Sequence, residues 1–255
     1  MQPPQPADAV PADTRGSSWL SVFDALVLAC IFAYLLLYFP PHLLLLDTMT
    51  VGGDTPAHNY LASHLREQLL QHGRIVSWAP GWWAGFPVFQ YYFCLPYLLI
   101  AAFSLILPFN IAFKCISVLG IFILPGAAYS FGRCLRLPRP APILMAIAML
   151  PGLFVRSHTM WGVNVHSTLA GMLANSISFP IMLLTIGSIY RDALDQRTRL
   201  RSTLLAALLL SSHFFTSIMA AVTLTILPFL LPRGSRVPAM RAMLPTAIRA
   251  ALLMA

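Results

Sequence analysis

Long, uninterrupted runs of apolar residues are separated along the chain by short polar segments. The first run extends from about Trp19 to Leu46 and contains a proline pair near its end, which predicts a membrane span with a kink. Because the runs are solid and lack the alternating pattern of barrel strands, they predict helices rather than a β-barrel. The sequence therefore predicts an all-α, polytopic helical membrane protein.

Later apolar runs predict further spans joined by short loops, and we expect them over about residues 111–131, 140–154 and 169–190. The run from Leu204 to Leu231 is too long for one span and has arginines on both flanks. It predicts a hairpin of two short helices that turns near residues 211–213. The sequence stops within another helical pattern, so we expect the chain to be the N-terminal part of a longer protein.

The segment between about residues 47 and 110 is polar and aromatic, which predicts a first outer loop. Within it, Thr55 and Pro56 have the pattern of a helix N-cap followed by proline at the first helical position, and Gly73 has the pattern of a helix end. Apolar residues recur every four positions between them, at Ala57, Leu61, Leu65 and Leu69. We expect an amphipathic helix on the membrane surface, followed by an aromatic segment at the level of the lipid headgroups.

The short apolar stretch from Leu95 to Leu107 decides the topology. If it crosses the membrane, the arginines at positions 133–139 and 191–201 lie outside. If it is re-entrant or juxtamembrane, as its length allows, these arginines lie inside together with the N-terminus and with Arg233, Arg236, Arg241 and Arg249. The positive-inside rule favours this second arrangement, with a cytoplasmic N-terminus and a second outer loop at about residues 155–168.

The composition agrees with a membrane protein. Hydrophobic residues make up 58% of the chain and charged residues 9%, against about 25% charged residues in soluble domains, which excludes a soluble globular enzyme. The net charge of +8 would suit nucleic acid, but the arginines lie in short loops between apolar runs, so we expect no nucleic-acid partner. Residues 1–17 predict a disordered tail before a transmembrane domain over residues 18–255.

The segment GGDTPAH offers the strongest candidate chemistry. Asp54 lies at the predicted start of a helix and His58 follows four residues later, so both side chains can face one place. A carboxylate beside an imidazole at the membrane surface can act as a general base or contribute to a divalent metal site. The alternative is that Asp54 only caps the helix and that His58 is a solvated surface residue.

The second outer loop is the other candidate, with Arg156, His158, Trp161, Asn164 and His166. Arginine with histidines at a lipid boundary suits a phosphate group. The alternative is an interfacial loop in which Trp161 sets the depth and Arg156 reaches lipid headgroups. Of the remaining polar residues, we expect His213 to be buried and hydrogen-bonded, Asp24 to be solvated, and Asp47 to be a weaker rival to Asp54.

An outer loop that opens with an aspartate before an amphipathic helix resembles the GT-C superfamily of glycosyltransferases. The segments GGDTPAH, WAPGWWAGFPVFQYYFCLPYLL and LLSSHFFTSIMA resemble bacterial membrane proteins called 6-pyruvoyl-tetrahydropterin synthase-related, over about residues 20–235. This resemblance implies a GT-C-like core in the bacterial cytoplasmic (inner) membrane. It further implies inverting transfer of a sugar from a polyprenyl-phosphate donor, with Asp54 as the base, with a divalent metal as a candidate cofactor, and with phosphate-binding groups at His58, Arg74, Arg156 and His166.

Pterin chemistry is excluded, because the chain cannot build the soluble zinc enzyme after which those proteins are named. The second outer loop has no acidic residue, unlike that of many GT-C proteins, which weakens the expectation of a metal, and Asn164 and His166 are the candidates to replace the missing acid. The alternative function is that of a non-catalytic membrane protein, either a transporter or an assembly component of envelope polysaccharide export. The expected partners are membrane lipid and a lipid-linked sugar, and the sequence predicts neither the sugar, nor its acceptor, nor the oligomeric state.

Overall fold

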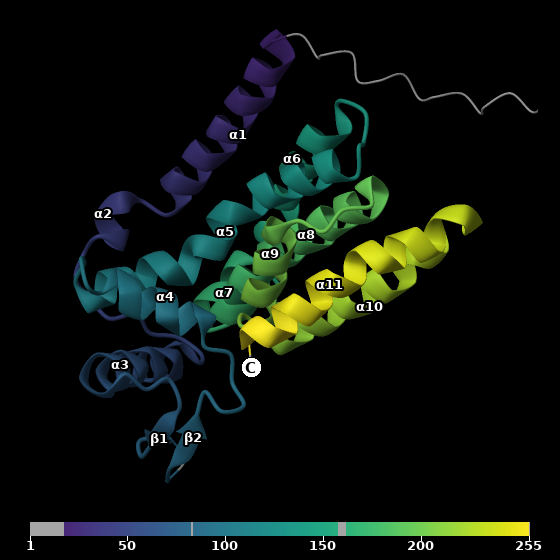
Figure 1. Ribbon diagram of the computed structural model, residues 1–255. Coiled ribbons are helices and arrows are strands. Elements are labelled where there is room, and N and C mark those ends of the chain that lie inside the picture. The colour runs from purple at the N-terminus through teal and green to yellow at the C-terminus, as the bar shows by residue number, and fades with distance from the viewer. Residues whose placement is uncertain (1–17, 83, 158–161, 255) are drawn as a thin grey trace, which may run out of the picture.

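The computed structural model describes residues 18–82, 84–157 and 162–254 (Figure 1). The predicted disordered tail over residues 1–17, as well as His158 and Trp161, lie outside the described residues. The first apolar run forms α1 (Ser18–Tyr38), and the proline pair starts a separate short helix, α2 (Pro41–Leu44). The predicted kink is therefore a complete break, because Pro40 adopts an extended conformation and Pro41 begins the new helix.

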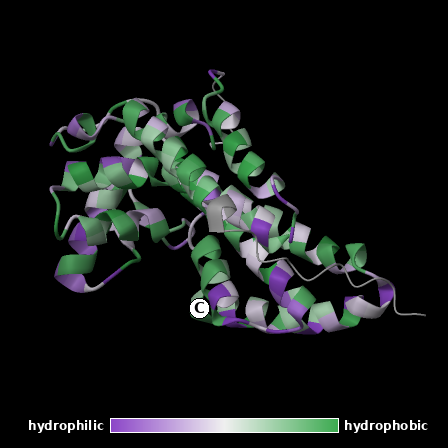
Figure 2. Cartoon of the chain, turned by 90° about the horizontal axis from the view of Figure 1, so that it is seen from above, coloured by the Kyte–Doolittle hydropathy of each residue, from purple (hydrophilic) through white to green (hydrophobic). Residues whose placement is uncertain are grey.

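The remaining long helices pack side by side in one bundle (Figure 1). They are α5 (Phe109–Cys134), α6 (Ala141–Leu153), α8 (Leu173–Asp195), α9 (Leu200–Leu210), α10 (Phe214–Leu230) and α11 (Arg236–Met254), with a 3-10 turn, η1 (Arg233–Ser235), before the last. The predicted hairpin is confirmed, since α9 and α10 meet at residues 211–213. Hydrophobic residues run along the helices (Figure 2), and among the described residues four helices are long and apolar enough to cross a membrane. The prediction of an all-α polytopic membrane protein is confirmed.

Smaller elements gather at one end of this bundle (Figure 1). They are α3 (Thr55–His72), the strands β1 (Ser77–Ala79) and β2 (Phe86–Val88), α4 (Leu95–Phe103) and α7 (Val165–Leu169). The two strands form an antiparallel hairpin in which Trp78 is opposite Pro87. The sequence pattern did not predict this hairpin, because its prolines and glycines conceal two three-residue strands. We call this end, together with α2 and the α9–α10 turn, the loop end.

The opposite end of the bundle, which we call the basic end, holds the arginines of the α5–α6 and α8–α9 loops. Arg136 pairs with Asp195 at 2.8 Å, and Arg139 pairs with Asp24 of α1 at 3.3 Å. These contacts place the start of α1 and both loops at one end. The nine-residue α4 is only about 14 Å long, which is too short to cross a hydrocarbon core of about 30 Å. The length of α4 therefore agrees with the arrangement in which the stretch at residues 95–107 does not cross.

The centre of the bundle is the packing of α5 against α8. The two backbones approach closely at Gly120, where a Cβ atom would lie 2.1 Å from the carbonyl oxygen of Ser176. Only glycine permits this approach, which buries the facing side chains of both helices. In this way α5 and α8 form the rigid frame that carries the loop end.

The helix α3 packs onto the protein rather than only onto a membrane surface. Its buried face includes Leu61 and Leu65, which join one hydrophobic cluster with Tyr97 of α4 and Phe113 of α5. Gly73 ends the helix in the left-handed conformation at φ 63°, as predicted. The N-cap is Asp54 and not Thr55, so the prediction was one residue late.

Two other expectations about charged residues are wrong. Asp24 is not solvated: it is 6% exposed and accepts a 2.9 Å hydrogen bond from the hydroxyl of Tyr129 in addition to its contact with Arg139. Arg249 was grouped with the cytoplasmic arginines, but it lies eight residues beyond Arg241 on α11. This places it about 12 Å further along a helix whose C-terminal end lies at the loop end (Figure 1).

Candidate functional site

The two predicted outer loops meet at the start of α3. The backbone N–H of Asp54 donates a 2.8 Å hydrogen bond to the carbonyl of Ala170, and the hydroxyl of Thr55 donates a 3.0 Å bond to the carbonyl of Leu169. A Cβ atom on Gly171, which has φ +117°, would lie 2.8 Å from the Cβ of Asp54. The turn that carries Asp54 is therefore held directly against the loop between α7 and α8.

The side chain of Asp54 is exposed and makes no capping hydrogen bond to the helix that it precedes. Its backbone is at φ −83° and ψ 1° rather than in the extended conformation of a side-chain cap. The interpretation that Asp54 merely caps the helix is therefore wrong. The backbone of Asp54 is held in position and its carboxylate remains accessible.

His58 lies one helical turn beyond Asp54 and is 8% exposed. Its Nδ1 atom is 2.6 Å from the hydroxyl of Tyr97 on α4, and the two rings stack with centroids 6.0 Å apart. The interpretation of His58 as a solvated surface residue is therefore wrong. Burial lowers the pKa of His58 from its ordinary value of 6.5, and the nearby Asp54 carboxylate only partly opposes this shift. A neutral imidazole at pH 7 can accept the hydroxyl hydrogen of Tyr97 at Nδ1.

A chain of aromatic rings leads from Tyr97 to His213 at the α9–α10 turn. Tyr92 lies near both Asp54 and Tyr97, and burial is the main cause that raises its pKa. The next ring, Phe93, has its centroid 4.8 Å from that of His213. The backbone N–H of Leu95 donates a 3.0 Å bond to the carbonyl of Ser211, which fixes the aromatic segment against this turn.

His213 was predicted to be buried and hydrogen-bonded, and only the first part is confirmed. It is 7% exposed, but its Nδ1 atom has no hydrogen-bond partner among the described residues. A buried polar nitrogen without a hydrogen-bond partner lowers the stability of the fold, so such an atom often marks a functional position or a bound water or ion. His213 thus becomes a candidate site residue, although the sequence predicted only a buried structural role for it, since only the tertiary structure brings it next to the aromatic segment.

The second outer loop contributes in a different way from the one expected. The side-chain amide of Asn164 donates to the carbonyls of Val155 and Ser157, and its oxygen caps α7 by accepting from the N–H of Ser167. Asn164 therefore organises the loop and has no free group with which to replace a missing acid. His166 is exposed, and its carbonyl accepts from Ala170, the residue that binds the Asp54 backbone.

The two candidate arginines, Arg156 and Arg74, follow the ends of α6 and α3. Arg156 is exposed and follows α6, whose end packs against α1 through Phe154 and Tyr38. Arg74 is exposed beyond the far end of α3, and the 18 residues of this helix correspond to about 27 Å. The structure therefore does not bring Arg74 next to Asp54. Asp47 accepts a 2.9 Å bond from Asn110 and belongs to the contact between α2 and α5.

A metal site would need more ligands than this cluster offers. Asp54 and His58 provide two suitable side chains on neighbouring turns, but no group of three His, Cys, Asp or Glu side chains within residues 18–82, 84–157 and 162–254 is arranged to hold a metal ion. The described residues by themselves do not fit a protein-bound metal.

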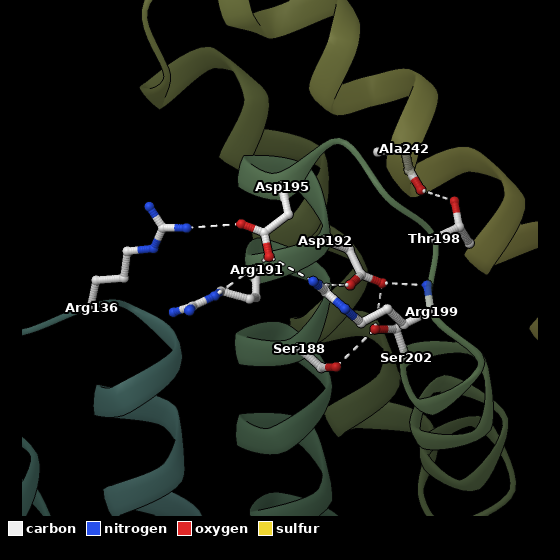
Figure 3. Close-up of polar contacts among 9 residues, drawn as sticks. All are labelled: Arg136, Ser188, Arg191, Asp192, Asp195, Thr198, Arg199, Ser202 and Ala242. Atoms are coloured by element: carbon white, nitrogen blue, oxygen red, sulfur yellow. Dashed lines mark hydrogen bonds and ion pairs between the residues drawn. The ribbon is translucent and has the colours of Figure 1, made fainter. Parts of the chain in front are cut away.

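The most strongly connected polar cluster lies at the basic end (Figure 3). Asp192 is fully buried, and its carboxylate accepts from the Arg199 side chain at 2.7 Å, from the Arg199 N–H at 3.0 Å and from the Ser202 hydroxyl at 2.7 Å. Asp195 also binds Arg199, at 2.6 Å. Each carboxylate oxygen of Asp192 has a partner, so this cluster joins α8 to α9 and the Asp192 carboxylate has no free oxygen for chemistry.

The fold defines a polytopic helical membrane protein with a polar and aromatic site at the loop end. No curated protein and no solved structure matches the chain. Residues 89–255 match the family model described as the 6-pyruvoyl-tetrahydropterin synthase related domain, a membrane protein. The chain belongs to this family. The matched region includes Tyr97, Asn164 and His213 but not Asp54 or His58, which lie before it.

Proposed function

We propose that the protein is an integral-membrane glycosyltransferase that moves a sugar from a polyprenyl-phosphate donor to an acceptor hydroxyl at the outer face of the membrane. The observation that carries this proposal is the state of Asp54. Its carboxylate is exposed and makes no capping hydrogen bond, and its backbone is held between two loops by the 2.8 Å hydrogen bond to Ala170. A general base needs such a fixed and accessible carboxylate.

In this reaction the oxygen of the acceptor hydroxyl attacks the anomeric carbon of the donor sugar. The bond between that carbon and the phosphate oxygen breaks, and its electron pair leaves with the polyprenyl phosphate. The hydroxyl proton passes to the carboxylate of Asp54, which releases it to solvent after the product departs. Attack from the face opposite the leaving group inverts the configuration of the sugar.

The buried neighbours of Asp54 fit the role of positioning groups. The hydrogen bond between His58 and Tyr97 joins α3 to α4 and fixes the helix turn that follows the carboxylate. His166 and Arg156 are the exposed basic side chains of the second loop that are candidates for the leaving phosphate. Arg74, about 27 Å along α3, is no longer part of the proposed site.

The location of the polar residues favours an interfacial enzyme over a transporter. A transporter places polar groups at mid-membrane in broken helices. In the described residues, by contrast, the carboxylates gather near the two ends of the bundle, with Asp54 at the loop end and Asp192 and Asp195 at the basic end. A donor whose chain stays in the lipid can present its sugar to a group at the loop end.

The test uses membrane vesicles that contain the protein, supplied with polyprenyl phosphate carrying radiolabelled glucose, mannose or galactose. We expect the labelled sugar to leave the lipid-linked donor as polyprenyl phosphate is released, and Asp54→Asn should lower the initial rate of this loss of label by at least about 100-fold, the minimum typical of a lost general base. The matched control is Asp47→Asn, which removes an exposed carboxylate of the same loop and should leave the rate unchanged.

A second measurement separates binding from chemistry. Every such donor contains polyprenyl phosphate, so polyprenyl phosphate without a sugar serves as the binding probe. We expect it to raise the melting temperatures of the purified parent protein and of Asp54→Asn equally. An unchanged rate in Asp54→Asn contradicts the role of Asp54. No release from any donor, together with no thermal shift by polyprenyl phosphate, contradicts the proposed function as a whole.

A further inference from the structure

A long cavity lies between α8, α9, α10 and α11. Its volume is 720 Å³, which falls within the about 300–1,000 Å³ of ordinary ligand pockets. Its lining extends from Ser217 to Phe229 on α10 and from Val237 to Ala250 on α11. At 1.5 Å per residue these stretches are about 18 and 20 Å long, so the cavity is elongated along the helix axes.

The wall of this cavity is apolar even where the lining residues carry hydroxyl groups. Three of these hydroxyls donate to backbone carbonyls of their own helices at 2.7–2.8 Å, namely those of Thr185, Ser217 and Thr225. The hydroxyl of Thr246 is buried and has no hydrogen-bond partner among the described residues. The wall therefore offers water almost no hydrogen bonds, and a hydrocarbon chain suits it better.

Among the described residues that line the cavity, Arg241 carries the only charge. It is exposed and makes no hydrogen bond or ion pair with any described residue. The residue that follows Arg241 is Ala242, and its carbonyl accepts a 2.9 Å hydrogen bond from the hydroxyl of Thr198 in the α8–α9 loop. This contact, visible in Figure 3, fixes Arg241 at the basic end.

We propose that this cavity binds an anionic glycerophospholipid of the leaflet at the basic end, with one acyl chain between α10 and α11 and its phosphate at Arg241. An exposed guanidinium that lines an apolar cavity and has no partner among the described residues complements a phosphate attached to hydrocarbon. Basic pockets between membrane-spanning helices are typical sites for anionic lipid headgroups. The length of about 18–20 Å exceeds half of a hydrocarbon core of about 30 Å, so a chain from one leaflet can lie along it.

The test uses the purified full chain in bilayer discs of phosphatidylcholine mixed with phosphatidylglycerol, followed by native mass spectrometry. We expect phosphatidylglycerol to stay bound in preference to phosphatidylcholine. Arg241→Gln should weaken the retention of phosphatidylglycerol about tenfold or more, since it removes a charge-assisted hydrogen bond. Ala247→Phe, which fills the cavity from an exposed lining position, should weaken the retention of both lipids.

The matched control is Arg233→Gln, which removes an exposed arginine before α11 that does not line the cavity, and it should retain lipid like the parent. Circular dichroism and elution volume check that each variant is folded. Equal retention of the two lipids by the parent, or unchanged retention in Arg241→Gln, overturns the proposal. A lipid-free dimer would mean that a second copy occupies the cavity instead. No sugar donor is involved, so this result is independent of the proposed function.

Discussion

The backbone N–H of Asp54 lies 2.8 Å from the carbonyl oxygen of Ala170, although 116 positions separate the two residues in the sequence. This hydrogen bond joins the start of α3 to the loop between α7 and α8. Because the bond is made by the backbone, the carboxylate of Asp54 remains free. The position of this candidate base therefore depends on the packing of two loops and not on its own side chain.

The first prediction concerns the close contact between these loops. Gly171→Ala places a methyl group 2.8 Å from the Cβ of Asp54 at φ +117°. We expect it to destabilise the protein by about 1–3 kcal/mol and to lower the melting temperature by about 2 °C or more. The control is Gly152→Ala in α6, where nothing lies within 4 Å and alanine favours the helix. Equal melting temperatures for both variants would show that the two loops are not in contact.

The second prediction concerns the hydrogen bond between Tyr97 and His58. Tyr97→Phe removes the hydroxyl and leaves Nδ1 of a buried imidazole without a partner, which should cost about 1–3 kcal/mol. Tyr91→Phe serves as the control, because Tyr91 is 77% exposed and should tolerate the change. Thermal unfolding in detergent measures both variants. A Tyr97→Phe protein as stable as the parent would contradict the hydrogen bond.

The third prediction is a pH dependence that arises from His58. Burial lowers its pKa below the ordinary value of 6.5, so the unfolded chain binds more protons than the folded protein in this range. Stability should therefore fall as the pH drops from 7 through 6.5 toward 5. His64 contributes in the same direction, since burial also lowers its pKa. His58→Gln should reduce the slope of melting temperature against pH without removing it, and an unchanged slope would contradict the assignment to His58.

The fourth prediction concerns the network at the basic end. Asp192→Ala leaves the arginine and serine that bind a fully buried carboxylate without their partner. The Arg199 side chain that remains is 40% exposed and keeps its contact with Asp195, so we expect a loss of about 1–3 kcal/mol, the usual cost of leaving hydrogen-bonding groups without a partner, measured by thermal unfolding in detergent. Asp195→Ala should be milder, since the Asp195 side chain is 24% exposed and its partners reach solvent. Equal effects would mean that burial does not set the strength of this network.

The fifth prediction concerns the orientation in the membrane. With the native cysteines replaced, Leu137→Cys at the basic end should react with an impermeant thiol reagent only after the cells are permeabilised. Ile75→Cys at the loop end should react in intact cells. The two side chains are similarly exposed, at 37% and 39%, so accessibility within the protein does not explain a difference. Labelling of Leu137→Cys in intact cells would invert the proposed topology.

The sequence by itself determined the class of fold and the approximate bounds of the spans. Solid apolar runs can satisfy their backbone groups in lipid only as helices, and this constraint acts on each segment separately. The α9–α10 hairpin and the end of α3 at Gly73 could also be predicted from local pattern alone, because arginines on both flanks and a glycine C-cap are local signals. The arginines in the loops also favoured an arrangement in which the stretch near residues 95–107 does not cross, and the nine-residue length of α4 agrees with it.

The state of each candidate side chain was decided only by the tertiary structure. The sequence identified Asp54 and His58, but whether Asp54 caps a helix or His58 is solvated depends on residues far away, namely Ala170 and Tyr97. Likewise, the sequence could not show that Arg74 lies far from Asp54, that Asn164 is used by its own loop, or that His213 lies against Phe93. Hydrogen bonds and burial of this kind depend on how the helices pack, and this packing cannot be predicted from the local sequence pattern.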